Sequence, residues 1–103
     1  DLIREALVKE EWSNPREKVA ATVTLVYDHH TRMLTDKITE VQHDRGDLIV
    51  SALHVHLDHH NCLEVIVLRG RAGEVQALAD NLSAIRGVKH AQVTLATEGK
   101  ALV

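Results

Sequence analysis

The sequence predicts an α+β domain, a sandwich in which strands and helices follow one another in the order βαββαβ. Three observations support this prediction. The chain has 103 residues, 45% of them hydrophobic, which is enough for one compact core. Stretches with the β-branched or alternating pattern of strands enclose two stretches with apolar residues at helical spacing. Their order is that of the split βαβ, or ferredoxin-like, arrangement.

A short amphipathic helix is expected before the sandwich, over residues 1–11. Its apolar stripe consists of Leu2, Ile3, Ala6 and Leu7. The segment starts without an initiator Met or a capping residue, so we expect the helix to continue in a longer protein. The Ser-Asn-Pro sequence at residues 13–15 ends it, because proline lacks an amide hydrogen and restricts the residue before it. We therefore assign residues 1–18 to the end of another domain's helix and a linker, and residues 19–103 to the sandwich.

The first strand and the first helix of the sandwich are expected in the first half of the chain. Residues 19–27 are rich in β-branched side chains, and apolar residues alternate with threonines. Asp28 can cap the next element, which is expected to be a helix over residues 30–42. Its apolar residues at helical spacing are Leu34, Ile38 and Val41. The Arg-Gly-Asp sequence at residues 45–47 supplies a turn.

A hairpin, a second helix and a last strand complete the order. The hairpin strands are expected at residues 48–57 and 62–68, on either side of a polar loop. The second helix is expected to end at Gly87, and residues 88–96 form the last strand. The apolar stripe of this helix consists of Val75, Leu78, Ala79, Leu82 and Ile85.

The two faces of the sheet are expected to differ, because in this arrangement both helices cover the same face. We place the strand of residues 48–57 in the middle of the sheet, and its side chains alternate between the two faces. The set expected to face the helices is Leu53, Val55 and Leu57. The set expected on the bare face is Val50, Ala52, His54 and His56, joined by Ile66 and Leu68 of the next strand. A bare face that is partly apolar predicts a symmetric oligomer.

Composition argues against several classes of function. The net charge is −3 and the basic residues are scattered, so this fragment has no patch to hold DNA by itself. The chain has no apolar run long enough to cross a bilayer and no layout of a secretion signal, so we expect a cytoplasmic protein without a membrane partner. The sequence also lacks a glycine-rich phosphate loop, a nucleophile elbow and a carboxylate pair, which argues against an enzyme.

Histidine is unusually frequent: the chain has 8 histidines and one cysteine, beside one Tyr, one Trp and no Phe. His54 and His56 lie on the same side of one strand. If residues 57–61 form the hairpin loop, antiparallel pairing places Cys62 opposite His56 and creates a site with two nitrogen donors and one sulfur donor. The alternative is a free buried thiol beside two surface histidines. The open fourth position can hold water, as in a metalloenzyme, or another side chain.

His43, near the end of the first helix, is the candidate for the fourth ligand. We expect it to come from a neighbouring subunit, because the hairpin ligands are expected on the face that their own helices leave bare. The alternative is a histidine that stabilises the helix C-terminus through the helix dipole. Thiolate and imidazole donors suit Ni(II), Cu(II) and Zn(II), whereas Mg(II) and Ca(II) prefer oxygen.

The string VQHDRGDLIVSALHVHLDHHNCLEVIVLRG, residues 41–70, resembles the metal-binding core of the nickel-responsive regulators, the NikR repressors. The resemblance implies one planar Ni(II) site per subunit. The donor chemistry allows Cu(II) or Zn(II) as substitutes. The ligands of the site would be His54, His56 and Cys62 of one subunit and His43 of another. It further implies a homotetramer. The leading DLIREAL resembles the end of the second helix of the family's ribbon-helix-helix domain, so DNA binding is expected through an N-terminal domain absent from this chain.

Other residues have expected roles near this site. Glu64 lies on the same strand face as Cys62, where it can accept a hydrogen bond from a ligand histidine or pair with an interface Arg or Lys. Tyr27 and His29 match positions near the family's metal-linked helix. We interpret His30, His59 and His60 as surface residues that sometimes bind additional metal ions, and His90 as a structural residue. A further function considered is an ACT-type domain that binds an amino acid, since ACT domains share the order βαββαβ, but it leaves the His/His/Cys register unexplained.

Overall fold

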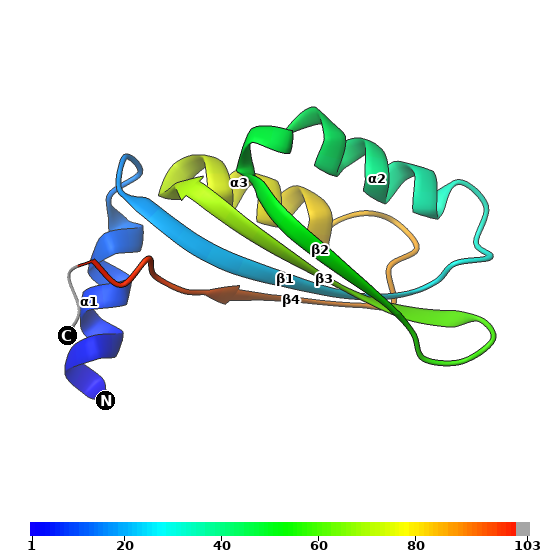
Figure 1. Cartoon of the computed structure of the whole chain (residues 1–103), viewed down its shortest axis with the longest axis horizontal. Coiled ribbons are helices and arrows are strands. Elements are labelled where there is room, and N and C mark those ends of the chain that lie inside the picture. The colour runs from blue at the N-terminus through cyan, green and yellow to red at the C-terminus, as the bar shows by residue number, and fades with distance from the viewer. Residues whose placement is uncertain (101–103) are drawn as a thin grey trace.

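The computed structural model describes residues 1–100, and residues 101–103, the end of the predicted sandwich, lie outside the described residues. The order βαββαβ is confirmed, with one helix before it (Figure 1). The elements are α1 (Leu2–Ser13), β1 (Lys18–Asp28), α2 (Leu34–Asp44), the 3-10 helix η1 (Gly46–Leu48), β2 (Ile49–His56), β3 (Asn61–Arg71), α3 (Ala72–Ser83) and β4 (His90–Leu95).

The four strands form one antiparallel sheet in the order β2-β3-β1-β4, and α2 and α3 lie on the same face of it (Figure 1). The two long strands, β1 and β3, pair over their whole length, from Lys18 opposite Arg71 to Asp28 opposite Asn61. These two strands therefore form the centre of the sheet, and β2 lies at an edge. The expected middle position of β2 was wrong, because β1 pairs with both β3 and β4 and so takes a central position, which leaves β2 with β3 as its only partner strand in the described sheet.

The core lies between the two central strands and the helices. Every second residue of β1 from Val19 to Tyr27 is buried, and so is every second residue of β3 from Cys62 to Leu68. The helices cover them with buried apolar side chains, which are Leu34 and Ile38 of α2 and Ala72, Val75, Leu78, Ala79 and Leu82 of α3. Burial of one of the Leu, Ile or Val side chains stabilises the fold by roughly 1.5–3 kcal/mol, so this layer fixes the strands that carry the candidate site.

The assignment of the two sheet faces was wrong for β2 and β3. Ala52, His54 and His56 are paired in register with residues of β3 that are buried under the helices, so these histidines lie on the helix side of the sheet. Ile66 and Leu68, expected on the bare face, are buried in the core. The apolar residues of the bare face are instead Leu53 and Val55 of β2 and Leu63, Val65 and Val67 of β3.

Two helix boundaries differ from the expectation. α2 begins at Leu34 rather than at residue 30, because the Asp28 carboxylate accepts a hydrogen bond from the His30 amide at 2.8 Å and caps a turn instead of the helix. α3 ends at Ser83, before the expected Gly87. Gly87 has a φ of 101° in the following loop, and a Cβ there would lie 3.2 Å from the Leu34 side chain. Glycine is therefore required by the turn and by the packing against α2.

α1 ends at Ser13, as the Ser-Asn-Pro sequence predicted, and none of its residues is buried. It crosses one end of the sheet beside the chain that follows β4 (Figure 1). Trp12 attaches its last turn there, because the indole Nε1 donates a hydrogen bond to the Ala96 carbonyl at 2.8 Å. No helix in the described part of the chain is long and apolar enough to cross a membrane.

Candidate metal centre

The β2–β3 hairpin brings the two strand histidines and the cysteine together. His56 lies directly opposite Cys62, and His54 lies opposite Glu64. The loop closes as expected, with the Leu57 amide donating to the Asn61 carbonyl at 2.9 Å. The predicted register of the hairpin is confirmed, so the two imidazoles and the sulfur are on one face of one hairpin.

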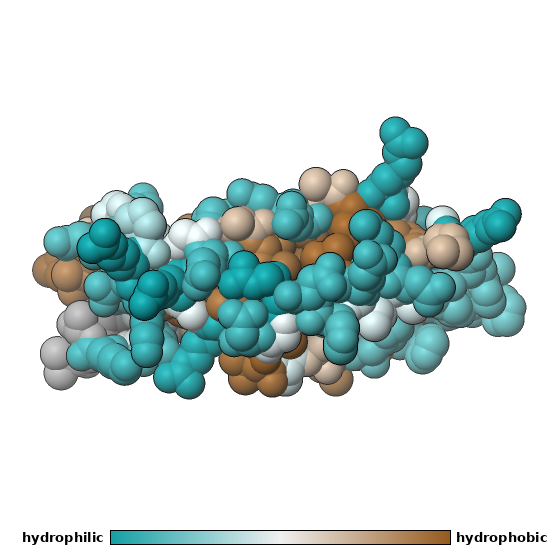
Figure 2. Space-filling view, turned by 90° about the horizontal axis from the view of Figure 1, so that it is seen from above, coloured by the Kyte–Doolittle hydropathy of each residue, from teal (hydrophilic) through white to brown (hydrophobic). Residues whose placement is uncertain are grey.

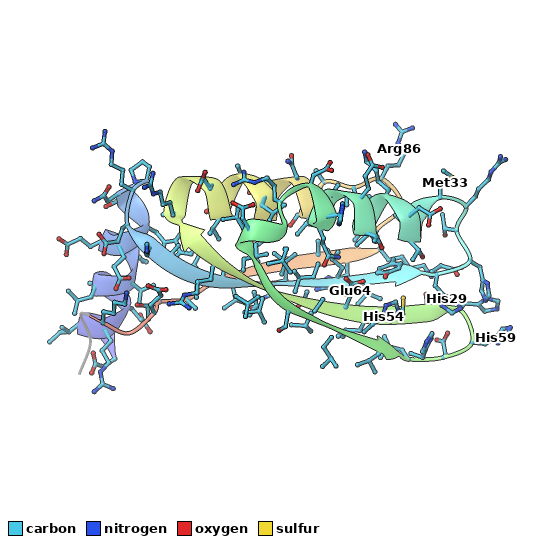
Figure 3. The ribbon with its side chains drawn as sticks, turned by 45° about the horizontal axis from the view of Figure 1, so that its top comes forward. His29, Met33, His54, His59, Glu64 and Arg86 are labelled. Atoms are coloured by element: carbon cyan, nitrogen blue, oxygen red, sulfur yellow. The ribbon has the colours of Figure 1, made fainter. Side chains whose placement is uncertain are left out.

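His54 and His56 occupy the exposed part of this arrangement. Their ring centroids are 5.4 Å apart, and the His54 side chain is 40% exposed. The exposure follows from the position of β2 at the edge of the sheet, where no strand covers its outer side. Figure 3 shows His54 and Glu64 beneath α2, toward the end of the sheet where His29 and His59 lie. The imidazoles are therefore reachable from outside the subunit.

Cys62 occupies the buried part. Its side chain is fully buried, and the Sγ lies 3.4 Å from the Tyr27 carbonyl, to which the thiol donates. Burial raises the pKa of the Cys62 thiol, and the nearby Glu64 carboxylate adds to this effect. The thiol is therefore protonated at neutral pH in the metal-free protein, and an ion bound to this sulfur must displace the proton.

Glu64 links β1, β3 and α2 beside the hairpin ligands. Its side chain is buried, and its carboxylate accepts hydrogen bonds from the Tyr27 hydroxyl at 2.7 Å and from the Gln42 amide at 2.8 Å. Burial, followed by this hydrogen bond to Glu64, raises the pKa of Tyr27 well above its usual value, so the phenol keeps its proton and donates it. The same carboxylate lies 3.7 Å from Nδ1 of His54. Glu64 is thus held at a distance from which it can orient the ring of His54.

Glu64 and Tyr27 were expected near the site, but Gln42 was not. The available signal was its position on α2, four residues after the buried Ile38 and therefore on the inner side of the helix. A polar residue in that stripe needs a partner, and the partner is Glu64.

His29 lies beside the hairpin histidines. Its ring centroid is 5.3 Å from that of His56 and 4.1 Å from that of His30. Desolvation lowers the pKa of His29, and the neighbouring imidazoles lower it further. Its Nδ1 is buried without a hydrogen-bond partner. A buried ring nitrogen without a partner costs free energy unless a ligand or water satisfies it, which fits a place where a ligand binds.

His43 is at the end of α2, as expected, but the subunit does not bring it to the hairpin ligands. The residue is exposed, and no hydrogen bond, ion pair or ring contact among the described residues joins it to His54, His56 or Cys62. Within residues 1–100, no group of three or more His, Cys, Asp or Glu side chains is already arranged to hold an ion. One subunit therefore provides part of a site, with donors of the kind that bind Ni(II).

Comparison with known proteins shows the family to which the chain belongs. Residues 20–96 match the family described as the NikR C terminal nickel binding domain. A protein of Geobacter sulfurreducens that is named as a nickel-responsive regulator is 56% identical over 102 residues, which cover 99% of this chain and 73% of the relative. One of Solibacter usitatus is 54% identical over 99 residues, which cover 96% of this chain and 71% of the relative.

Solved structures with low sequence identity share the fold. An uncharacterized protein of Thermotoga maritima has a TM-score of 0.66 at 19% identity, over 77% of this chain and 98% of that one. The ACT domain from a GTP pyrophosphokinase of Chlorobium tepidum has a TM-score of 0.56 at 19% identity, over 74% of this chain and 85% of that one. The predicted ferredoxin-like, ACT-like fold is thereby confirmed, and the likeness concerns the fold alone.

Proposed function

This chain belongs to the NikR nickel-responsive regulators as their nickel-binding domain, and we propose that it binds one Ni(II) per subunit through His54, His56 and Cys62, completed by His43 of a neighbouring subunit. Its relatives are named as regulators rather than enzymes. The observation that carries the proposal is the register of the hairpin, with Cys62 opposite His56 and His54 two residues away on the same face.

The donor set fits nickel. Two imidazoles and one thiolate suit Ni(II), Cu(II) and Zn(II), and a planar arrangement with a fourth nitrogen favours Ni(II) and Cu(II) over tetrahedral Zn(II). We therefore propose Ni(II) as the regulatory ion, with Cu(II) and Zn(II) as substitutes. Once bound, the ion supplies a bridge between ligands from different chains.

Residues of this chain orient the ligands. Glu64 lies close to Nδ1 of His54, and an Nδ1 proton shared with this carboxylate leaves Nε2 free to bind the ion. Tyr27 and Gln42 hold the carboxylate in place through their hydrogen bonds. Gln42 also connects α2 to this network, so the position of α2 and the orientation of the His54 ring depend on each other.

Gln42 and His43 are consecutive, which gives the end of α2 two roles. Gln42 contacts Glu64 of its own subunit, while His43 is exposed and available to another. In the proposed assembly, α2 is therefore attached to its own site through one residue and to a neighbour's site through the next. Ion binding then favours the arrangement of subunits that brings His43 to the ion, and that arrangement favours ion binding to the same degree.

The bare face supports an oligomer, although its residues differ from the expectation. Leu53 is 62% exposed and Val55 is 39% exposed, on the reverse side of the strand that carries the site histidines. Leu57, in the following loop, is 53% exposed. A second subunit could bury this apolar face, which lies on the opposite side of the sheet from the site histidines. We propose a homotetramer built from such contacts.

We further propose that the protein acts on DNA in the cytoplasm, through a ribbon-helix-helix domain to which α1 belongs. Leu2 and Ile3 of α1 are 82% and 75% exposed, and another domain packed on the helix would bury them. The relatives are longer than the matched segment, which covers 71–73% of their length. In this proposal, the oligomer ordered by Ni(II) promotes DNA binding by that domain, and repression follows.

An absorption titration tests the ligand set. Addition of Ni(II) should produce a thiolate-to-metal charge-transfer band that saturates at one equivalent per subunit. Cys62→Ser should abolish the band and weaken binding, while circular dichroism stays that of the folded domain. His54→Ala should weaken binding, and His90→Ala, an exposed histidine on β4, should not. Unchanged affinity in Cys62→Ser would exclude this sulfur as a ligand.

A further inference from the structure

The end of α2 is attached to α3 by an ion pair that lies two residues beyond His43. Arg45 directly follows the last residue of α2 and forms its C-cap. Its guanidinium Nη2 lies 3.4 Å from the Oε1 atom of Glu74, which is in the first turn of α3. The C-terminal end of α2 is therefore joined to the N-terminal end of α3 within the helix layer that covers the sheet (Figure 1).

The same guanidinium holds the turn that follows α2. The Arg45 Nε and Nη2 atoms donate to the two carboxylate oxygens of Asp47, each at 3.3 Å. The Arg45 carbonyl accepts a hydrogen bond from the Leu48 amide at 3.0 Å, and the Leu48 side chain is buried in the core. A planar guanidinium can serve two carboxylates at once, which a lysine ammonium does less well. Arg45 is thus fixed to the core on one side and to α3 on the other.

His43 lies between two attachments of the last turn of α2. Before it, Gln42 donates to Glu64 on the sheet, and after it, Arg45 pairs with Glu74 on α3. Successive residues of a helix point about 100° apart, so His43 is exposed although Gln42 faces the sheet. The last turn of a helix lacks backbone partners and frays easily. Two attachments to different elements therefore limit how far this turn, and His43 with it, can move.

Resting on the proposed function, we propose that Arg45 is a positioning residue of the nickel site. By tying the end of α2 to α3, it holds His43 in the orientation from which it reaches a neighbour's ion, before the ion binds. A ligand that is already held loses less conformational entropy on binding. The Arg45 and Glu74 side chains are 38% and 51% exposed, so the pair contributes little to the stability of the whole domain and acts mainly on the helix end.

Nickel affinity, measured in competition with a chelator, tests this role. Glu74→Gln keeps the shape of the side chain and leaves the contacts of Arg45 with Asp47 in place, so it isolates the link to α3. Glu74→Gln and Arg45→Met should each weaken binding by about three- to fivefold, the range that a surface ion pair can supply. Lys37→Met, which removes an exposed charge from the same helix, is the control and should leave the affinity unchanged. At about 1 M salt the loss in Glu74→Gln should disappear, because ion pairs are screened there.

A double-mutant cycle with His43→Ala separates positioning from general support of the fold. In the His43→Ala background, Glu74→Gln should weaken binding no further, because its effect passes through His43. An equal loss in both backgrounds would overturn the proposal, and so would unchanged affinity in either Glu74→Gln or Arg45→Met. Circular dichroism checks that all variants are folded.

The single variant His43→Ala tests the proposed function separately. If it binds Ni(II) as tightly as the wild-type chain, His43 is not a ligand, and the proposed ligand set and the role of Arg45 are both wrong. If it binds more weakly while Glu74→Gln matches the wild-type chain, the ligand set stands and only the role of Arg45 is wrong.

Discussion

The two sides of the candidate nickel site differ in how completely the fold builds them. The inner side, on the central strands, has Cys62 fully buried and Glu64 fixed by hydrogen bonds from Tyr27 and Gln42. The outer side, on the edge strand, has His54 and His56 exposed. The core thus preorganises one side without the ion, while the other side is left for the ion and a neighbouring subunit to order. Substitutions on the two sides should therefore have different consequences.

The largest effect on folding is expected on the inner side. Glu64→Ala removes the acceptor of the Tyr27 hydroxyl and the Gln42 amide, and should lower the free energy of unfolding of the metal-free protein by about 2–4 kcal/mol. His56→Ala, on the exposed outer side, should lower it by less than about 0.5 kcal/mol. Urea unfolding of the two variants in chelator measures both values. Equal losses would mean that the two sides do not differ as described.

The pH dependence of nickel binding should report the buried thiol. Because the pKa of Cys62 is raised, the ion must displace the thiol proton at every pH below that pKa, so affinity should rise about tenfold per pH unit above pH 7. Toward pH 5 affinity should fall further, because protons compete with the ion for the ligand nitrogens. Cys62→Ser should lose the rise above pH 7. A flat profile in the wild-type chain would argue against thiolate ligation.

Substitutions on the bare face of the edge strand should have the smallest effect on folding. They should nevertheless affect assembly clearly. Leu53→Lys places a charge in the exposed apolar patch and should change the stability of an isolated subunit by less than about 0.5 kcal/mol. It should weaken subunit association strongly, because the charge would be buried in the interface. Gln92→Lys, exposed on β4 of the same face, is the control. Sedimentation measures the oligomeric state. If Leu53→Lys forms the same oligomer as the wild-type chain, the interface lies elsewhere.

The sequence predicted the element order and the hairpin register because both depend on local chemistry. The polar residues between β2 and β3 limit the length of the loop, and that length alone places Cys62 opposite His56. The face of the hairpin could not be predicted in the same way. Apolar residues occur on both faces of β3, as Leu63 and Val65 on one and Ile66 and Leu68 on the other, so alternation did not show which set the helices cover.

Neither the sequence pattern nor the structure of a single subunit identifies the ligand that a neighbouring subunit contributes. His43 is exposed at the end of α2, and its partners in the proposed site belong to another chain. The role of Gln42 was missed for a related reason, since its partner Glu64 is 22 residues away and meets it only through the packing of α2 on the sheet. Contacts of this kind depend on tertiary and quaternary structure.

The most direct test of the account mixes subunits with complementary defects. His43→Ala and His54→Ala proteins should each bind Ni(II) weakly. If His43 crosses between subunits, mixed oligomers contain interfaces at which one complete site reassembles, so strong binding and the charge-transfer band should return in a fraction of the sites. A mixture of His54→Ala and Cys62→Ser should show no recovery, because both residues belong to the same hairpin. If the first mixture fails to recover after subunit exchange has been demonstrated, His43 does not complete a neighbour's site, and the account of nickel sensing given above is wrong.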